Sequence, residues 1–206
     1  MIPPMTGHCN LTYPLTRDLQ ARKESNSLTK PQVGNFVRPF CEDGHKFIQT
    51  AADNLLELTA SKTNTITFPP KRSRNAPPSA PIPAPEILTI PQTISHFVMN
   101  LPATAISFLP SFTGLYHGHE ALFEPHTPTK LPMVHVHCFS TKSDDNARET
   151  VEICQRVSES LGCEIRPGDP DLVVYEVRDV APKKRMFCAS FRLPAEVAFR
   201  SRRGAS

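Results

Sequence analysis

His96-Phe-Val-Met-Asn-Leu-Pro102 has the pattern of a buried strand that runs into a polar residue and then a proline. Proline has no N–H and a fixed φ, so Pro102 ends the strand ladder and holds the following turn stiffly. Asn100 offers one acceptor and two donors at the carboxyl end of the strand, where open α/β sheets bind ligands. The stretch predicts a ligand-binding amide. The alternative is that Asn100 caps a helix beginning at Ala103.

Strands and helices alternate on either side of this stretch. The helix over 45–58 is the clearest, because its apolar residues recur at i, i+3, i+4, i+7 and i+8. Further helical spacing covers 103–116, broken by Pro110, and 144–161, which Ser143 can cap. Strands are predicted at 36–41, 94–99, 133–139, 173–177 and 186–193. This order is typical of an α/β sheet that ends in a hairpin-like pair of strands.

The rest of the chain divides by composition. Residues 1–32 show no periodicity and are expected to be irregular. The domain is predicted to span 33–199, interrupted at 69–91, where eight prolines and few aliphatic residues predict a flexible, extended insertion. Residues 200–206 form a basic tail. The 206 residues suffice for one domain with insertions.

Composition limits the class of protein. No stretch approaches about 20 apolar residues, so no membrane span is expected, and the first residues lack the pattern of a secretory signal. The six cysteines form no C-x-x-C pair, which favours buried free thiols over disulfides or zinc. No metal site is predicted, because no Cys or carboxylate completes a ligand spacing with the histidines at 117, 119, 126, 135 and 137.

Positive charge is clustered although the net charge is only +3. The clusters are Lys71-Arg-Ser-Arg74, Lys183-Lys-Arg185 and Arg200–Arg203. Such clusters can neutralise phosphates. They can equally be a solvated linker, a charged hairpin turn and a solvated tail.

Four segments together resemble one known family. They are Val37-Arg-Pro-Phe-Cys-Glu-Asp-Gly44, His96–Pro102, His135-Val-His-Cys-Phe139 and the long block Val177–Pro194. The resemblance is to the archaeal and eukaryotic tRNA (guanine(37)-N1)-methyltransferases, closest to the fungal members, and covers 33–58 and 93–199. It implies a class I, Rossmann-like sheet and methyl transfer from S-adenosyl-L-methionine to N1 of guanosine 37. A monomer that binds tRNA, in cytoplasm, nucleus or mitochondrial matrix, is expected.

The resemblance also implies roles for single residues. Asn100 would lie beside both the cofactor and the target guanine, in a turn that Pro102 stiffens. Asp43 and Gly44 would bind the cofactor's adenine, Asp43 by accepting from its amino group. The alternative for this pair is a simple Asp-Gly turn. Lys183, Lys184 and Arg185 would touch the tRNA backbone.

Part of the family's pattern has no counterpart in the 206 residues. The Gly-rich cofactor turn Asp-x-Phe-Ala-Gly-x-Gly-Pro-Phe is missing, since no G-x-G occurs, and the family's general base and guanine-handling Arg lie upstream of that turn. Asn10-Leu-Thr-Tyr-Pro14 resembles a decayed form of the ribose-binding segment. The sheet is expected to be incomplete at its N-terminal side, with Val98 and Val136 exposed.

We therefore expect these residues alone to bind S-adenosylmethionine weakly and not to methylate tRNA, as a truncated gene product or a degenerate protein. One alternative is a non-catalytic remnant that binds tRNA or a partner. Another is a related aminocarboxypropyl transferase, against which Pro102 argues, because those relatives usually lack the Pro after Asn-Leu.

Overall fold

The computed structural model describes residues 37, 39–70, 75, 77, 79, 81–141, 146–182 and 184–202. The predictions for residues 1–32, for Lys71–Arg74, for Ser143 as a cap and for Lys183 lie outside these residues. Among the described residues, no helix is long and apolar enough to cross a membrane.

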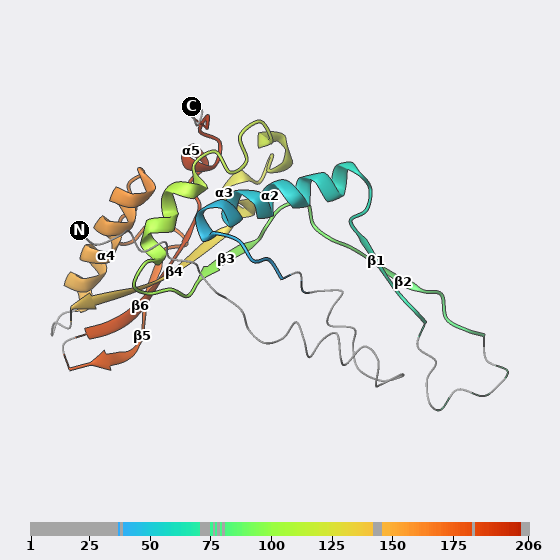
Figure 1. Cartoon of the computed structure of the whole chain (residues 1–206), viewed down its shortest axis with the longest axis horizontal. Coiled ribbons are helices and arrows are strands. Elements are labelled where there is room, and N and C mark those ends of the chain that lie inside the picture. The colour runs from blue at the N-terminus through green and yellow to red at the C-terminus, as the bar shows by residue number, and fades with distance from the viewer. Residues whose placement is uncertain are drawn as a thin grey trace, which may run out of the picture.

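A four-stranded mixed sheet forms the centre of the fold (Figure 1). Its order is β3-β4-β6-β5, with β3 at His96–Met99, β4 at Met133–Thr141, β6 at Lys184–Arg192 and β5 at Val173–Ala181. β3 is parallel to β4, and β6 is antiparallel to both β4 and β5. The predicted closing pair of strands is confirmed, and only β6 runs against the other three.

One face of this sheet holds the hydrophobic core. Helix α4 (Asn146–Leu161) and the 3₁₀ helix η2 (Ala105–Phe112) pack on it. The core residues are Val134, Val136 and Cys138 of β4, Phe187, Ala189 and Phe191 of β6, Ile153, Val157 and Leu161 of α4, and Leu109 and Phe112 of η2. Val98 is 66% exposed, as predicted, but the predicted exposure of Val136 is wrong: it is fully buried because it faces this covered side.

Helix α2 (Gly44–Ala60) confirms the helix predicted over 45–58 and packs against η2. The strand predicted over 36–41 is wrong for the residues described there. Val37 and Pro39–Cys41 are irregular, and Val37 and Phe40 are exposed. Pro39 explains the difference, because it cannot donate a ladder hydrogen bond. These residues lead directly into α2.

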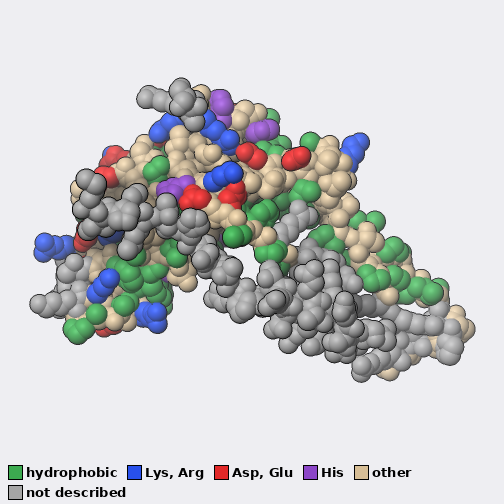
Figure 2. All heavy atoms as spheres, viewed as in Figure 1, with side chains coloured by type: hydrophobic (Ala, Val, Ile, Leu, Met, Phe, Trp, Pro, Cys, Tyr) green, Lys and Arg blue, Asp and Glu red, His purple; other side chains and the backbone are tan. Residues whose placement is uncertain are grey.

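The predicted insertion is partly ordered. β1 (Thr65–Phe68) and β2 (Glu86–Thr89) pair antiparallel as a ribbon that projects beyond the end of α2 (Figure 1). The flexible segment predicted at 69–91 is therefore too long, because 86–89 form a strand. Ile87 and Leu88 follow the last closely spaced prolines and suit a strand. Both are exposed, and apolar side chains follow the ribbon in Figure 2.

Three short elements complete the described fold: η3 (Glu120–Leu122) and α3 (Thr127–Lys130) lie between η2 and β4, and α5 (Ala195–Ala198) follows β6. Backbone hydrogen bonds join Gly114 and Tyr116 to α5, through Gly114 N to Val197 O (2.8 Å) and Tyr116 N to Ala198 O (2.9 Å). They fix the loop after η2 to α5.

Candidate functional site

A tight turn follows strand β3 and presents Asn100. Leu101 O accepts from Thr104 N at 2.8 Å and from Ala105 N at 2.7 Å, which places Pro102 second in the turn, the position that its fixed φ favours. Asn100 is exposed. The alternative that it caps the next helix is not supported, because η2 begins at Ala105 after Thr104 and has no side-chain cap.

Asp43 caps the start of helix α2. Its Oδ1 accepts from His45 N at 2.9 Å and from Lys46 N at 3.3 Å, so one carboxylate oxygen satisfies two of the free N–H groups of the first turn. The side chain is exposed. Its second oxygen remains available to accept a hydrogen bond from a ligand.

Gly44 allows close packing within the protein. A Cβ at this position would lie 3.2 Å from the Phe108 ring, a distance at which the ring must shift. The predicted role of Gly44 was close approach to a cofactor, whereas the neighbour that the structure places there is η2. No local pattern indicates this contact, because Phe108 lies 64 positions away in the chain.

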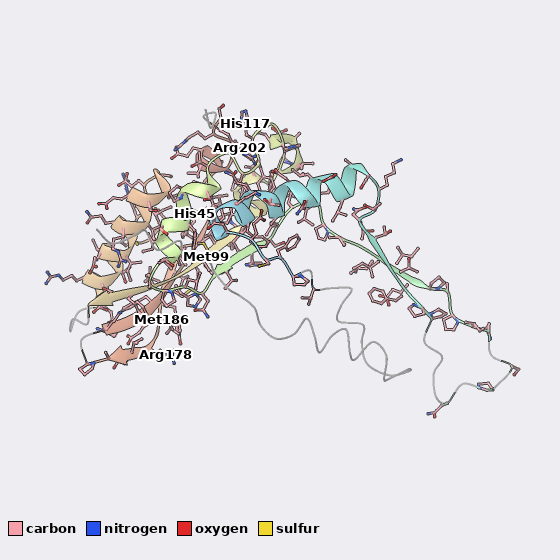
Figure 3. All side chains as sticks on the ribbon, viewed as in Figure 1. His45, Met99, His117, Arg178, Met186 and Arg202 are labelled. Carbon is pink, nitrogen blue, oxygen red and sulfur yellow. The ribbon has the colours of Figure 1, made fainter. Side chains whose placement is uncertain are left out.

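The 3₁₀ helix η2 links the start of α2, where Asp43 and Gly44 lie, to the turn after β3, where Asn100 lies. His45 Nδ1 lies 3.2 Å from Ser111 Oγ, and the His45 and Phe108 rings meet edge to face at 4.6 Å. On its other side, η2 continues directly from the turn that holds Asn100. Figure 3 labels His45 and Met99, the chain neighbours of Gly44 and Asn100, at the ends of α2 and β3 that flank η2.

Exposed apolar side chains lie in the chain next to both Asp43 and Asn100. Val37 and Phe40 precede α2, and Val98 and Leu101 flank Asn100. A few polar groups set among apolar ones are typical of a ligand site. The exposed Asn100 amide and the free Asp43 carboxylate oxygen can donate to and accept from a planar, polar ligand.

The basic residues at the start of β6, Lys184 and Arg185, do not both lie where they could contact a phosphate. Lys184 is exposed, with its Nζ 3.9 Å above the Phe139 ring. Arg185 is buried and forms ion pairs with Glu149 (3.0 Å) and Glu176 (2.9 Å). The prediction that Arg185 touches the tRNA backbone is corrected: its guanidinium ties α4 to β5 and β6. Of the three predicted residues, Lys184 is the one that the structure describes on the surface.

The second face of the sheet carries a pair of histidines, His96 and His135, that the sequence pattern did not predict. His96 Nδ1 lies 3.0 Å from His135 Nε2, and His135 Nδ1 lies 2.8 Å from Ser190 Oγ. Burial lowers the pKa of His135, and the charges of His96 and His137 lower it further. The pattern showed that His135 and His137 share a face, but only the parallel register of β3 and β4 brings in His96. Within the described ranges, no three His, Cys, Asp or Glu side chains gather as a metal site.

The five described cysteines are free thiols. Cys138 and Cys154 are buried, as predicted, and burial raises the pKa of Cys138 to about 11. Cys41 is exposed, because the segment before α2 is not the strand that the sequence predicted.

Comparison with curated proteins finds relatives from fungi. The chain is 53% identical over 181 residues to a tRNA (guanine(37)-N(1))-methyltransferase of Fusarium vanettenii. It is 55% identical over 179 residues to the protein of that name from Phaeosphaeria nodorum, and 51% over 180 residues to that from Neurospora crassa. These matches cover 82–86% of this chain but only 37–40% of the relatives.

The chain thus spans about two fifths of the length of the curated relatives it matches. No family model matches the chain, and no solved structure matches it.

Proposed function

We propose that this chain, which is similar in sequence to fungal tRNA (guanine(37)-N1)-methyltransferases, carries the part of their site that places the tRNA guanine beside the cofactor. The observation behind the proposal is the exposed Asn100 amide at the carboxyl end of β3, in a turn stiffened by Pro102. The strand order β3-β4-β6-β5, with β6 alone reversed, is consistent with one side of a class I, Rossmann-like sheet. Within this proposal, S-adenosylmethionine is the cofactor and tRNA the substrate.

The chemistry explains why an amide is useful. Guanine N1 carries a proton at neutral pH, so a base must remove it before N1 can accept a methyl group, and negative charge then develops on O6. The Asn100 N–H groups would donate to O6 and stabilise that charge, and a rigid amide suits the edge of a flipped-out base. S-adenosylmethionine, when bound, supplies an electrophilic methyl group. The base is not among the residues that we assign.

Asp43 would hold the adenine end of the cofactor. Its Oδ1 caps α2, and its Oδ2 would accept from the adenine amino group. Gly44 would contribute indirectly, because it lets η2 pack closely against the start of α2. One short helix therefore connects the adenine-binding end to the guanine-binding end.

A non-catalytic role is the second candidate, favoured by the exposed Lys184 at the start of β6. In that case the chain would bind tRNA without a cofactor. Titration of S-adenosylmethionine into the chimera described next separates the two, because only a cofactor site makes the affinity depend on Asp43.

A chimera tests the cofactor role of Asp43. The matching 181 residues of the Fusarium vanettenii relative are replaced by those of this chain, and binding of S-adenosylmethionine is titrated. Asp43→Ser keeps a good helix cap but is too short to reach the adenine, so affinity should fall about tenfold to a hundredfold with the unfolding midpoint unchanged. Asp43→Asn retains an acceptor and should lose less. If the Asp43→Ser chimera binds S-adenosylmethionine as tightly as the unsubstituted chimera, Asp43 is only a helix cap.

A further inference from the structure

A pocket lies at the end of the sheet opposite Asn100. Its volume is about 620 Å³. Ser95 and His96 border it at the start of β3, Met133 at the start of β4 and Arg192 at the end of β6. Four strand residues of about 3.3 Å each separate the two ends, so the pocket lies about 13 Å from Asn100 along β3. It is therefore distinct from the site described above.

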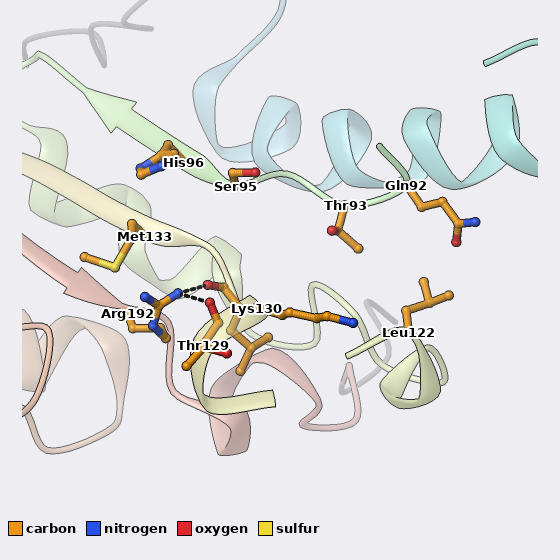
Figure 4. Close-up of a pocket in the computed structure, with 10 residues that line it drawn as sticks. Gln92, Thr93, Ser95, His96, Leu122, Thr129, Lys130, Met133 and Arg192 are labelled. Atoms are coloured by element: carbon orange, nitrogen blue, oxygen red, sulfur yellow. Dashed lines mark hydrogen bonds between the residues drawn. The ribbon is translucent and has the colours of Figure 1, made fainter. Parts of the chain in front are cut away.

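The lining of the pocket is basic and rich in hydrogen-bonding groups. Two of the ten lining residues are cationic, and none is acidic. The hydroxyl and amide side chains belong to Gln92, Thr93, Ser95 and Thr129. Figure 4 shows the side chain of Lys130 pointing toward Leu122, with Thr93 and Gln92 on the opposite side of the hollow. A pocket of this composition favours an anion.

The two cations play different parts. Arg192 is fixed in the wall: its Nε donates to Asp171 at 2.7 Å, and its Nη1 donates to the carbonyls of Thr129 and Leu131, both at 2.7 Å. Asp171 balances its charge. Lys130 is exposed and forms no ion pair within the described part of the chain. The net positive charge facing the hollow is therefore that of Lys130.

His96 adds a donor at the edge of the pocket. Its Nδ1 is engaged by His135 Nε2, and His135 Nδ1 is engaged by Ser190 Oγ. When the Ser190 hydroxyl donates to His135 and His135 donates to His96, the His96 proton must reside on Nε2. When both bonds run the other way, Nε2 is an acceptor. A bound anion selects the first arrangement, in which His96 Nε2 is a hydrogen-bond donor.

We propose that this pocket binds a phosphate group of the RNA chain, with Lys130 as its charged contact and His96 as a donor. The inference rests on the proposed function, which makes RNA the substrate. A single unbalanced lysine holds a free phosphate weakly, whereas a phosphate within a polymer gains from its neighbouring contacts. The pocket would thus fix the RNA backbone while Asn100 contacts the base.

Fluorescence anisotropy tests the proposal, with the full chain and a labelled 17-nucleotide RNA hairpin. Each neutralised phosphate contributes about 0.9 to the slope of log K against log salt, or about eightfold in affinity at 0.1 M salt. Lys130→Ala should therefore weaken binding about eightfold and lower the slope by about one. Lys62→Asn removes one exposed positive charge at a φ of 56° that Asn tolerates, and should leave binding unchanged. Lys130→Arg should restore most of the affinity.

Several results would overturn the proposal. One is Lys130→Ala binding the hairpin like the wild type, and another is no binding by the wild-type chain. A third is inorganic pyrophosphate shifting the Lys130 and His96 amide resonances at lower concentration than the hairpin, which indicates a small phosphorylated ligand. If the chimera methylates tRNA while Lys130→Ala has no effect, the pocket assignment alone fails. If neither hairpin binding nor methylation occurs, the proposed function fails with it.

Discussion

Arg185→Met should destabilise the protein strongly, because it would remove the cation that pairs with the buried Glu149 carboxylate. The Arg185 side chain is 8% exposed and that of Glu149 2% exposed, and their closest atoms lie 3.0 Å apart. Glu176 is 35% exposed and can return to water. Breaking a buried pair in this way costs about 3–5 kcal/mol. With an m-value of about 2 kcal/mol/M, the urea midpoint should fall by about 1.5–2.5 M.

The control and the rescue separate this explanation from a general loss of packing. Lys184→Met, at the exposed neighbouring position, should change the free energy of unfolding by less than about 0.5 kcal/mol. Arg185→Met combined with Glu149→Leu removes both charges and should recover most of the stability, since replacing a buried pair by apolar side chains is often neutral. A double variant as unstable as the single one would refute the reasoning, as would an Arg185→Met midpoint equal to that of Lys184→Met.

Two further predictions concern titrating groups. The lowered pKa of His135 means that the unfolded chain binds more protons below about pH 6.5, so stability should be full above pH 7 and fall as the pH drops through this range. His135→Gln should therefore reduce the change in the urea midpoint between pH 7 and pH 5.5, whereas His126→Gln should not. Equal pH dependence of the midpoint in the two variants would contradict this prediction. Cys41 should react with a disulfide reagent at pH 8 in the folded protein, whereas Cys138, buried and with its pKa raised to about 11, should react only after unfolding; rapid modification of Cys138 in the native state would exclude this burial.

Much of the fold could be predicted because its elements have strong local patterns. The stripe of α2 and the apolar runs of β3 and β4 identify themselves within a few residues, and the turn around Pro102 follows from the chemistry of proline. The strand expected at 36–41 failed because alternating apolar residues can precede a helix as well as form a strand. Pro39 was the available signal against it.

The remaining features depend on contacts between distant residues. Lys183-Lys-Arg185 looks like a turn in the sequence, but β6 begins at Lys184, and the register places Arg185 opposite Asp179 and facing α4. His96 meets His135 only because β3 and β4 are parallel in a particular register. The role of Gly44 depends on Phe108, which no local pattern connects to it. Asn100 was predictable as a strand-end amide, while its link to Asp43 through η2 required the fold.

The most direct test of the central proposal is methyl transfer by the Fusarium vanettenii chimera that carries these residues. Transfer from radiolabelled S-adenosylmethionine to tRNA is measured with guanosine or adenosine at position 37, and the product is identified as N1-methylguanosine. We predict methylation of the guanosine substrate alone, and a rate about a hundredfold to a thousandfold lower for Asn100→Ala, with the control Lys62→Asn unchanged. A folded, cofactor-binding chimera that leaves guanosine 37 unmethylated, or an Asn100→Ala variant at full rate, would contradict the proposal.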